Sequence, residues 1–259
     1  MTAPRIVAYS SPELLAAATA ARLVTRLVDA QAARGTAAVV LTGGRTGVAV
    51  LEQLRAAPAR DAVDWSRVDV YWGDERFLPA GDPDRNETQA RAALLDHVPV
   101  VPARVFAMAP FDGVYGDDPE AAAEAYAALL SAAARPEDHY PVPAFDVCLL
   151  GVGEEGHTAS IFPDSPAVYE TERSVVAVRD CPKAPPVRIS LTLPAIRRSA
   201  EVWLMTTGEC KAAAVAMALG GAGEIALPAA GARGQRRTLW LLDKAAAAKA
   251  SAMPSPPQA

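Results

Sequence analysis

Apolar residues along this chain fall into short continuous runs, separated by longer segments with a helical pattern. Such runs are typical of strands that are buried on both faces of a sheet. Because strand and helix signals alternate, they predict an α/β fold with an open, mostly parallel sheet and helices on both faces. Strands are predicted over residues 5–10, 37–41, 67–72, 145–150, 174–179, 201–207 and 238–242.

The clearest helix signal follows the first strand. Ser11 is a suitable cap, Pro12 lies in the first turn, and Gly35 marks the end of the helix. We expect one domain over residues 1–250, followed by a frayed tail over 251–259, which lacks a packable pattern. Further helices are predicted over residues 47–57, 86–95, 119–134 and 208–220.

Composition narrows the class of protein. The formal net charge of −5 over 259 residues argues against a nucleic-acid surface, which needs a basic stripe. No long apolar run or targeting signal occurs, so we expect a cytoplasmic protein that makes no contact with membranes. The cysteines, Cys148, Cys181 and Cys210, fit neither a disulfide framework nor a structural zinc site.

Four chemically unusual segments follow predicted strands. Ligands of open α/β sheets bind beyond the carboxyl ends of the strands, so these segments are expected to meet at one edge of the sheet. They are "TGGRTG" at 42–47, "GDERF" at 73–77, "GVGEEGHTAS" at 151–160 and "TGECK" at 207–211.

Residues 151–156 have the G-x-G-x-x-G spacing of a dinucleotide-binding turn. In that motif a pyrophosphate sits on the amino end of a long helix. Here Glu154 and Glu155 place carboxylates where the phosphates would lie, and two prolines interrupt any following helix. Asp180, at the end of the next strand, is the one feature that favours NAD. We therefore expect the glycines to form a tight turn that presents His157.

His157 is the leading catalytic candidate. A neutral imidazole can take a proton from water, and its ordinary pKa near 6.5 keeps it mostly neutral in the cell. The other two histidines, His97 and His139, are expected on surface connections.

Several residues suit an anionic ligand. Gly43, Gly44 and the Thr46 hydroxyl precede a predicted helix, an arrangement that suits a phosphate although it is not a P-loop. Arg188 can grip a phosphate through two parallel hydrogen bonds, and Lys211 can act as a point charge.

The "GDERF" segment leaves two roles open for its carboxylates. Asp74 and Glu75 could be acid/base groups, or they could orient Arg76.

The motifs together resemble the 6-phosphogluconolactonase family. The matching segments are "LTGGRTG", "YWGDERFLP", "FDVCLLGVGEEGHTASIFPDSP", "VRISLTLPAI" and "TGECKAAAV", and the resemblance covers about residues 5 to 245. It implies hydrolysis of 6-phospho-D-glucono-1,5-lactone to 6-phosphogluconate in the oxidative pentose phosphate pathway. It also implies a Rossmann-like sheet, shared with glucosamine-6-phosphate deaminase and ribose-5-phosphate isomerase, and no metal or organic cofactor. We expect the protein to act as a monomer on a small sugar-phosphate lactone.

The resemblance also implies roles for individual residues. His157 becomes the general base, and the loop with Gly43, Gly44 and Thr46 holds the phosphate together with Arg188 and Lys211. A separate inference, from the "DER" motif, is that Arg76 binds the substrate or the developing oxyanion.

Two departures from the family pattern concern the site. Arg45 and Gly47 stand where the family more often has serine and proline, so Arg45 adds a charge beside the phosphate. Glu155 replaces the usual aspartate before "GHTAS". We count Glu155 with His157 and Arg76 as a catalytic candidate, through a hydrogen bond to His157 or to neighbouring backbone.

Three alternatives stay open. The deaminase of the same fold group pairs its histidine with an acid five residues later, where this chain has Phe162, and it resembles "DEY" where this chain has "DER". The protein could instead bind sugar phosphates without turnover. An NAD-dependent dehydrogenase is the most distant alternative.

Overall fold

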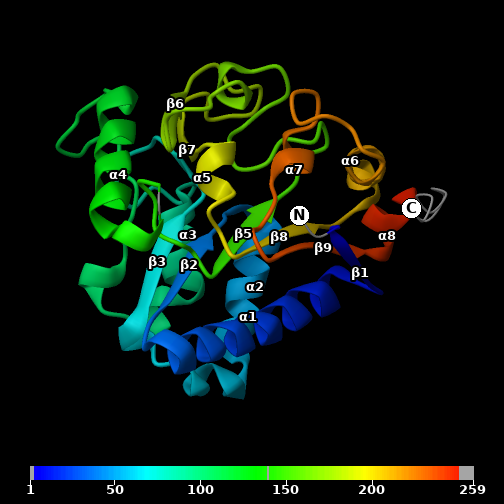
Figure 1. Ribbon diagram of the computed structural model, residues 1–259, viewed down its shortest axis with the longest axis horizontal. Helices are drawn as coiled ribbons and strands as arrows, with labels where there is room; N and C mark the ends of the chain where they lie inside the picture. The colour runs from blue at the N-terminus through cyan, green and yellow to red at the C-terminus, as the bar shows by residue number, and fades with distance from the viewer. Residues whose placement is uncertain (1–2, 139, 251–259) are drawn as a thin grey trace.

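The computed structural model describes residues 3–138 and 140–250 (Figure 1). Its main sheet has six strands, and every pairing within it is parallel. The predicted parallel α/β sheet is therefore confirmed. In order across the sheet the strands are β1 (Arg5–Tyr9), β9 (Arg237–Asp243), β8 (Glu201–Thr206), β5 (Val147–Gly151), β2 (Ala37–Leu41) and β3 (Val68–Trp72).

A second, antiparallel sheet lies beside the first (Figure 1). Its strands, in order, are β4 (Asp74–Arg76), β7 (Arg188–Leu191) and β6 (Val175–Val178). The predicted strand 174–179 corresponds to β6 of this antiparallel sheet. β4 and β7 were not predicted, because such short strands that carry arginines lack a long apolar run.

The helices begin and end close to the predicted boundaries. Ser11 caps α1, and Gly35 ends it in the left-handed conformation, with φ of 78°. α1 packs against α2, whereas α4 packs against β6 and β7 of the small sheet (Figure 1). The helices are α1 (Pro12–Arg34), α2 (Gly44–Ala56), α3 (Asn86–Ala93), α4 (Pro119–Ala133), α5 (Leu193–Ile196), α6 (Ala212–Leu219), α7 (Pro228–Gly231) and α8 (Lys244–Ala247).

One cluster of buried apolar side chains includes residues of both sheets. Trp72, Phe145 and Trp203 are among its largest fully buried members. Within the described part of the chain, no helix is long and apolar enough to cross a membrane. The prediction of one domain stays a prediction, and residue 139 and the tail over 251–259 lie outside the described residues.

Asp146 fixes the amino-terminal edge of the main sheet. One carboxylate oxygen accepts a hydrogen bond from the backbone N–H of Ala38 at 2.9 Å, and the other accepts from Arg34 at 2.6 Å. Arg26 of α1 lies 3.6 Å from the same carboxylate, whose side chain is 3% exposed. This buried charge therefore joins the start of β2, the end of α1 and the start of β5.

We expect Asp146→Asn to lower the free energy of unfolding by about 2–3 kcal/mol, because the buried side chain at this position loses the charge that pairs with Arg26 and Arg34. Chemical denaturation measures this loss. Asp61→Asn is the control, because the Asp61 side chain is 79% exposed, and we expect a change within about 0.5 kcal/mol. Equal stability of the two variants would contradict a structural role for Asp146.

Candidate active site

The four segments meet beyond the carboxyl ends of β2, β3, β5 and β8. Two adjoining cavities lie there, of about 170 and 190 Å³. We call the first the histidine cavity, and its lining residues are Thr42, Gly43, Gly44, Asp74, Arg76, Asn86, Gly151, Val152, Gly153, His157, Ala159, Arg188 and Lys211. We call the second the helix cavity, and residues 43–47, 151, 152, 205–207 and 211 line it.

The glycine segment forms the first turn of α2 and the wall of the helix cavity. α2 begins at Gly44 and not at residue 47, so the predicted boundary is three residues late. No side chain caps this end, which leaves backbone N–H groups available to an anion. Arg45 is exposed and lines the helix cavity, and the Thr46 hydroxyl lies 3.2 Å from the Thr207 hydroxyl.

Two glycines of this segment are required by close packing. A Cβ atom at Gly43 would lie 1.8 Å from Oδ1 of Asn86, and one at Gly47 would lie 2.4 Å from the carbonyl oxygen of Thr42. No ordinary side chain fits at either position without displacing its neighbour. The departure at Gly47 is therefore part of how this loop packs.

His157 lies directly against Gly153. A Cβ atom at Gly153 would be 1.9 Å from His157 Nδ1, and the Gly153 N–H donates to the His157 carbonyl oxygen at 2.9 Å. The Phe162 ring stacks on the imidazole with the ring centroids 4.4 Å apart. After His157 the chain forms a bridge between Thr158 and Ile161 and no helix, so the segment lacks the helix end that a pyrophosphate needs.

Glu155 supports the other side of the imidazole. Its Oε1 lies 3.0 Å from His157 Nδ1, although outside the direction in which an Nδ1–H would donate well. Its Oε2 accepts a hydrogen bond from Lys183 at 2.9 Å. Of the two partners foreseen for Glu155, the structure therefore places it beside His157.

The electrostatic surroundings keep His157 neutral. Burial lowers its pKa below the ordinary value, and the charge of Lys183 acts in the same direction, whereas Glu155 and Asp74 oppose them. Burial alone would raise the pKa of Glu155, but the hydrogen bond from Lys183 and nearby positive charge bring it down to about 2. A neutral imidazole beside a carboxylate has the protonation state that a general base requires.

Asp74 and Glu75, whose roles the sequence left open, have different surroundings in the structure. Asp74 lines the histidine cavity, and its Oδ2 accepts a hydrogen bond from the Ser160 hydroxyl at 2.7 Å. Glu75 is not among the lining residues and is fully buried. It accepts backbone N–H bonds from Asn86 at 2.6 Å and Glu87 at 2.8 Å, and burial raises its pKa to about 7. Glu75 therefore joins β4 to the start of α3.

Arg76 and Arg188 are direct neighbours across the small sheet. They are register partners in the β4–β7 pair, and both line the histidine cavity. Like charges directly opposite one another are destabilising, and no carboxylate of a described residue lies within 4.0 Å of either guanidinium. Arg188 is buried and donates to backbone carbonyls. Arg76 donates through Nη1 to the Asp84 carbonyl oxygen, while its buried Nε has no hydrogen-bond partner among the described residues. An anion between them would relieve this repulsion.

Sequence reasoning missed Asn86. Its Nδ2 donates to the Asp74 carbonyl oxygen at 2.7 Å, while its Oδ1 is buried without a hydrogen-bond partner in the described residues. The only local signal is a polar residue at the start of a helix, which is common in proteins. Its place in the cavity follows from the contact between β4 and α3.

Comparisons with known proteins agree with this geometry. A family model described as glucosamine-6-phosphate isomerases/6-phosphogluconolactonase matches residues 10–240. The chain belongs to this family. A protein of Streptomyces coelicolor named 6-phosphogluconolactonase is 64% identical over 246 residues, which are 95% of this chain and 94% of that protein.

Solved structures of the family share the fold. The structure of 6-phosphogluconolactonase from Trypanosoma brucei matches with a TM-score of 0.80 and 27% identity, over 96% of this chain and 99% of that one. A monomeric glucosamine-6-phosphate deaminase matches with a TM-score of 0.77 and 20% identity, over 95% and 99% of the two chains. The fold is therefore shared with a glucosamine-6-phosphate deaminase and does not by itself separate the two activities.

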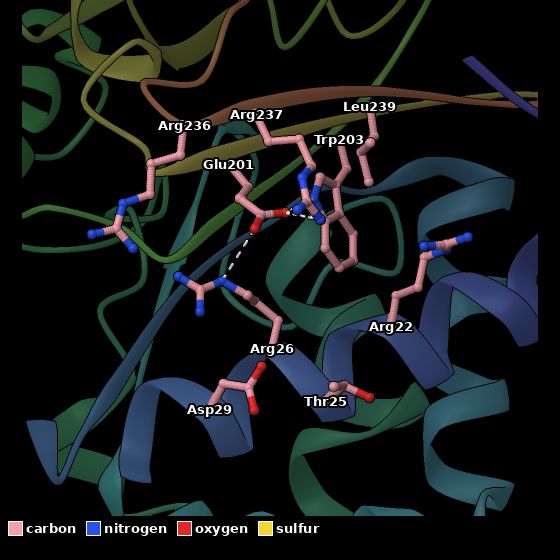
Figure 2. A pocket seen from close by; sticks show the side chains of 9 residues that line it. All are labelled: Arg22, Thr25, Arg26, Asp29, Glu201, Trp203, Arg236, Arg237 and Leu239. Carbon is pink, nitrogen blue, oxygen red and sulfur yellow. Dashed lines mark hydrogen bonds and ion pairs between the residues drawn. The ribbon is translucent and has the colours of Figure 1, made fainter. Parts of the chain in front are cut away.

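A larger cavity of about 480 Å³ lies near α1, β8 and β9, away from this site (Figure 2). Figure 2 shows that the guanidinium groups of Arg22 and Arg236 point away from one another. The Glu201 carboxylate between them already accepts from Trp203 at 2.9 Å and lies 3.4 Å from Arg26. Arg237 lies 3.9 Å from the same carboxylate, so Glu201 is already paired with two arginines, and we take the histidine cavity as the candidate active site.

No group of three His, Cys, Asp or Glu side chains in the described residues could hold a metal ion.

We expect Gly153→Ala to displace the imidazole and to cost about 1–3 kcal/mol of stability, because the new methyl group overlaps His157 Nδ1. NMR shifts of the His157 ring and chemical denaturation check this. Gly151→Ala is the matched control, since a Cβ atom there meets nothing within 4 Å. If both variants leave the ring signals unchanged, the contact between Gly153 and His157 does not position the imidazole.

Proposed function

We propose that this chain hydrolyses 6-phospho-D-glucono-1,5-lactone to 6-phosphogluconate in the oxidative pentose phosphate pathway, with His157 as the general base. The observation that carries the proposal is a largely buried imidazole whose Nδ1 lies 3.0 Å from a carboxylate oxygen, in a cavity that two arginines from paired strands also line. Burial lowers the pKa of this imidazole, which favours its neutral form. The name of the Streptomyces coelicolor relative, at 64% identity over nearly the whole chain, supports the lactonase branch.

His157 activates the attacking water in this mechanism. Its Nε2 accepts a proton as the water oxygen forms a bond to the lactone carbonyl carbon. When the tetrahedral intermediate collapses, the bond between that carbon and the ring oxygen breaks, and His157 returns the proton to the ring oxygen. The product is a carboxylic acid, which ionises at neutral pH. A positioned base of this kind contributes roughly 10²- to 10⁴-fold in rate, or about 3–5 kcal/mol.

Arg76 stabilises the developing oxyanion. Its Nε is a buried donor with no partner in the described residues, and the side chain lines the cavity that holds His157. A donor that is already desolvated strengthens its hydrogen bond as negative charge develops on the carbonyl oxygen. Asp74 positions the wall of this cavity through Ser160 and Asn86.

The phosphate is held by positive groups around the two cavities. The amino end of α2, with residues 43–46, supplies backbone N–H groups, and Arg45 adds a charge nearby. Lys211 borders both cavities. Arg188 hydrogen-bonds to backbone carbonyls through Nε and Nη2, so its Nη1 can donate to a phosphate oxygen.

Phe162 favours the lactonase over the deaminase. It occupies the position where the deaminase pattern requires an acid, and its ring stacks on His157 and leaves no carboxylate there. Ring opening by an acid–histidine relay would lack one proton carrier. Binding of sugar phosphates without turnover is less favoured, because it does not require a neutral imidazole held against a carboxylate.

The finer predictions from the sequence belong to this proposal. They are a monomeric state, a location in the cytoplasm and no binding of nucleic acid. Size-exclusion chromatography with light scattering tests the first of them.

We expect His157→Ala to lower kcat/KM for 6-phosphogluconolactone by at least about 10²-fold, because the base is removed. The lactone is generated in place by an upstream dehydrogenase, and its hydrolysis is followed at a pH low enough to slow spontaneous opening. His97→Ala is the control, because His97 is exposed, does not line either cavity and has its ring nitrogen 3.0 Å from the Ala92 carbonyl oxygen.

The role of His157 as a base also predicts how kcat/KM depends on pH. A base works when deprotonated, so kcat/KM falls as pH drops through the pKa of His157, which is lowered from 6.5. The acid limb is therefore expected below pH 6.5. Hydrolysis by the wild type no faster than in buffer would refute the lactonase assignment.

We expect Lys211→Met to lower kcat/KM for the phosphorylated lactone by about tenfold or more, because one charged hydrogen bond to the phosphate is lost. Unphosphorylated gluconolactone is the internal control, since it lacks the group that Lys211 contacts. An equal loss for both substrates would place Lys211 away from the phosphate.

A further inference from the structure

One carboxylate connects His157 to a lysine that no motif of the sequence singled out. Oε1 of Glu155 faces His157 Nδ1 at 3.0 Å, while Oε2 accepts a hydrogen bond from Lys183 Nζ at 2.9 Å. The two oxygens of a single carboxylate are therefore used for two different partners, and the position of Lys183 bears on the orientation of the carboxylate toward the imidazole.

The turn that carries Lys183 is tied to the small sheet by Arg188. Its Nη2 donates to the carbonyl oxygens of Lys183 at 2.9 Å and Ala184 at 3.2 Å, and its Nε donates to that of Pro185 at 3.2 Å. The Cys181 N–H closes the same turn by donating to the Pro186 carbonyl oxygen at 3.0 Å. A buried cation on a strand thus fixes the backbone on which Lys183 stands.

We propose that Lys183 is a positioning residue for the lactonase reaction: it holds Glu155 in place beside His157 and balances the carboxylate charge, so that the imidazole stays neutral and oriented. This inference rests on the proposed function of His157. Lys183 does not touch the reacting atoms, and it acts through Glu155.

The charges around His157 determine in which direction each substitution moves its pKa. Glu155 and Asp74 favour the protonated imidazole, whereas burial and the charge of Lys183 favour the neutral form. The remaining charged groups that line the cavity, Arg76, Arg188 and Lys211, are all positive. Removal of Lys183 leaves the Glu155 charge unbalanced, so the pKa of His157 rises. Removal of the Glu155 charge lowers it.

The ion pair contributes little to folding. The side chains of Lys183 and Glu155 are 43% and 33% exposed, and solvent screens ion pairs with that exposure. A variant at Lys183 is therefore expected to fold, and its kinetics can be read without a correction for stability.

The test compares Lys183→Met, Lys183→Arg and Glu155→Gln with the wild type, and Lys244→Met, an exposed lysine on α8, is the matched control. The pH profile of kcat/KM on 6-phosphogluconolactone is measured from about pH 5 to 8, across the ordinary pKa of histidine. NMR titration of the His157 ring is the second readout. The chain has three histidines, so His97→Gln and His139→Gln assign the signals.

We expect Lys183→Met to move the acid limb and the His157 titration to higher pH, with a loss of about threefold or more near pH 6 and less at pH 8. Lys183→Arg restores the wild-type profile, because it keeps the charge. Glu155→Gln moves the His157 titration in the opposite direction. Lys244→Met changes neither readout.

A merely structural role for Lys183 would lower kcat/KM equally at every pH and leave the His157 titration in place, and that result would overturn the proposal. So would shifts in the same direction for Lys183→Met and Glu155→Gln. If the wild type hydrolyses no lactone, the proposed function fails, and the NMR titrations alone decide whether Lys183 controls the protonation of His157.

Discussion

Parallel pairing of β2, β5 and β8 is the constraint on which the rest of the site depends. Val39 and Val40 of β2 are register partners of Val147 and Cys148 of β5, and β5 pairs with β8 along its whole length. Because all three strands run in one direction, the segments that follow them emerge at one edge. The amino end of α2, the turn before His157 and the segment with Lys211 are therefore neighbours in space.

The small antiparallel sheet supplies two arginines that line the histidine cavity. Its strands β4 and β7 run antiparallel, so they bring Arg76 and Arg188 together from segments more than a hundred residues apart. The sheet is attached to the main one where the Leu191 N–H donates to the Gly73 carbonyl oxygen at 2.8 Å. Cations from the small sheet thus face a histidine and a helix end from the large one. This division explains how a cavity of modest size brings a histidine and two arginines together.

Charge in the site is balanced by a few shared groups. Glu155 is shared between His157 and Lys183, and Arg188 is shared between the cavity and the turn that carries Lys183. Because Glu155 and Arg188 each contact two groups, a substitution of either residue changes the surroundings of both of its partners. The larger cavity near α1 is different, since its Glu201 carboxylate is already paired with Arg26 and Arg237 and accepts a hydrogen bond from Trp203.

The amino-acid sequence was enough to predict the parallel α/β fold, the resemblance to the family and a glycine turn that presents His157. These depend on local patterns, namely apolar runs, strand-end motifs and a histidine in a glycine turn. Only the tertiary structure decided that Glu75 supports α3, that Asn86 enters the cavity and that Lys183 holds Glu155. These contacts join residues that are distant along the chain and leave no periodic signal. The physical reason is that a short antiparallel strand, or a salt bridge between two turns, is specified by its partner in space and not by its neighbours in sequence.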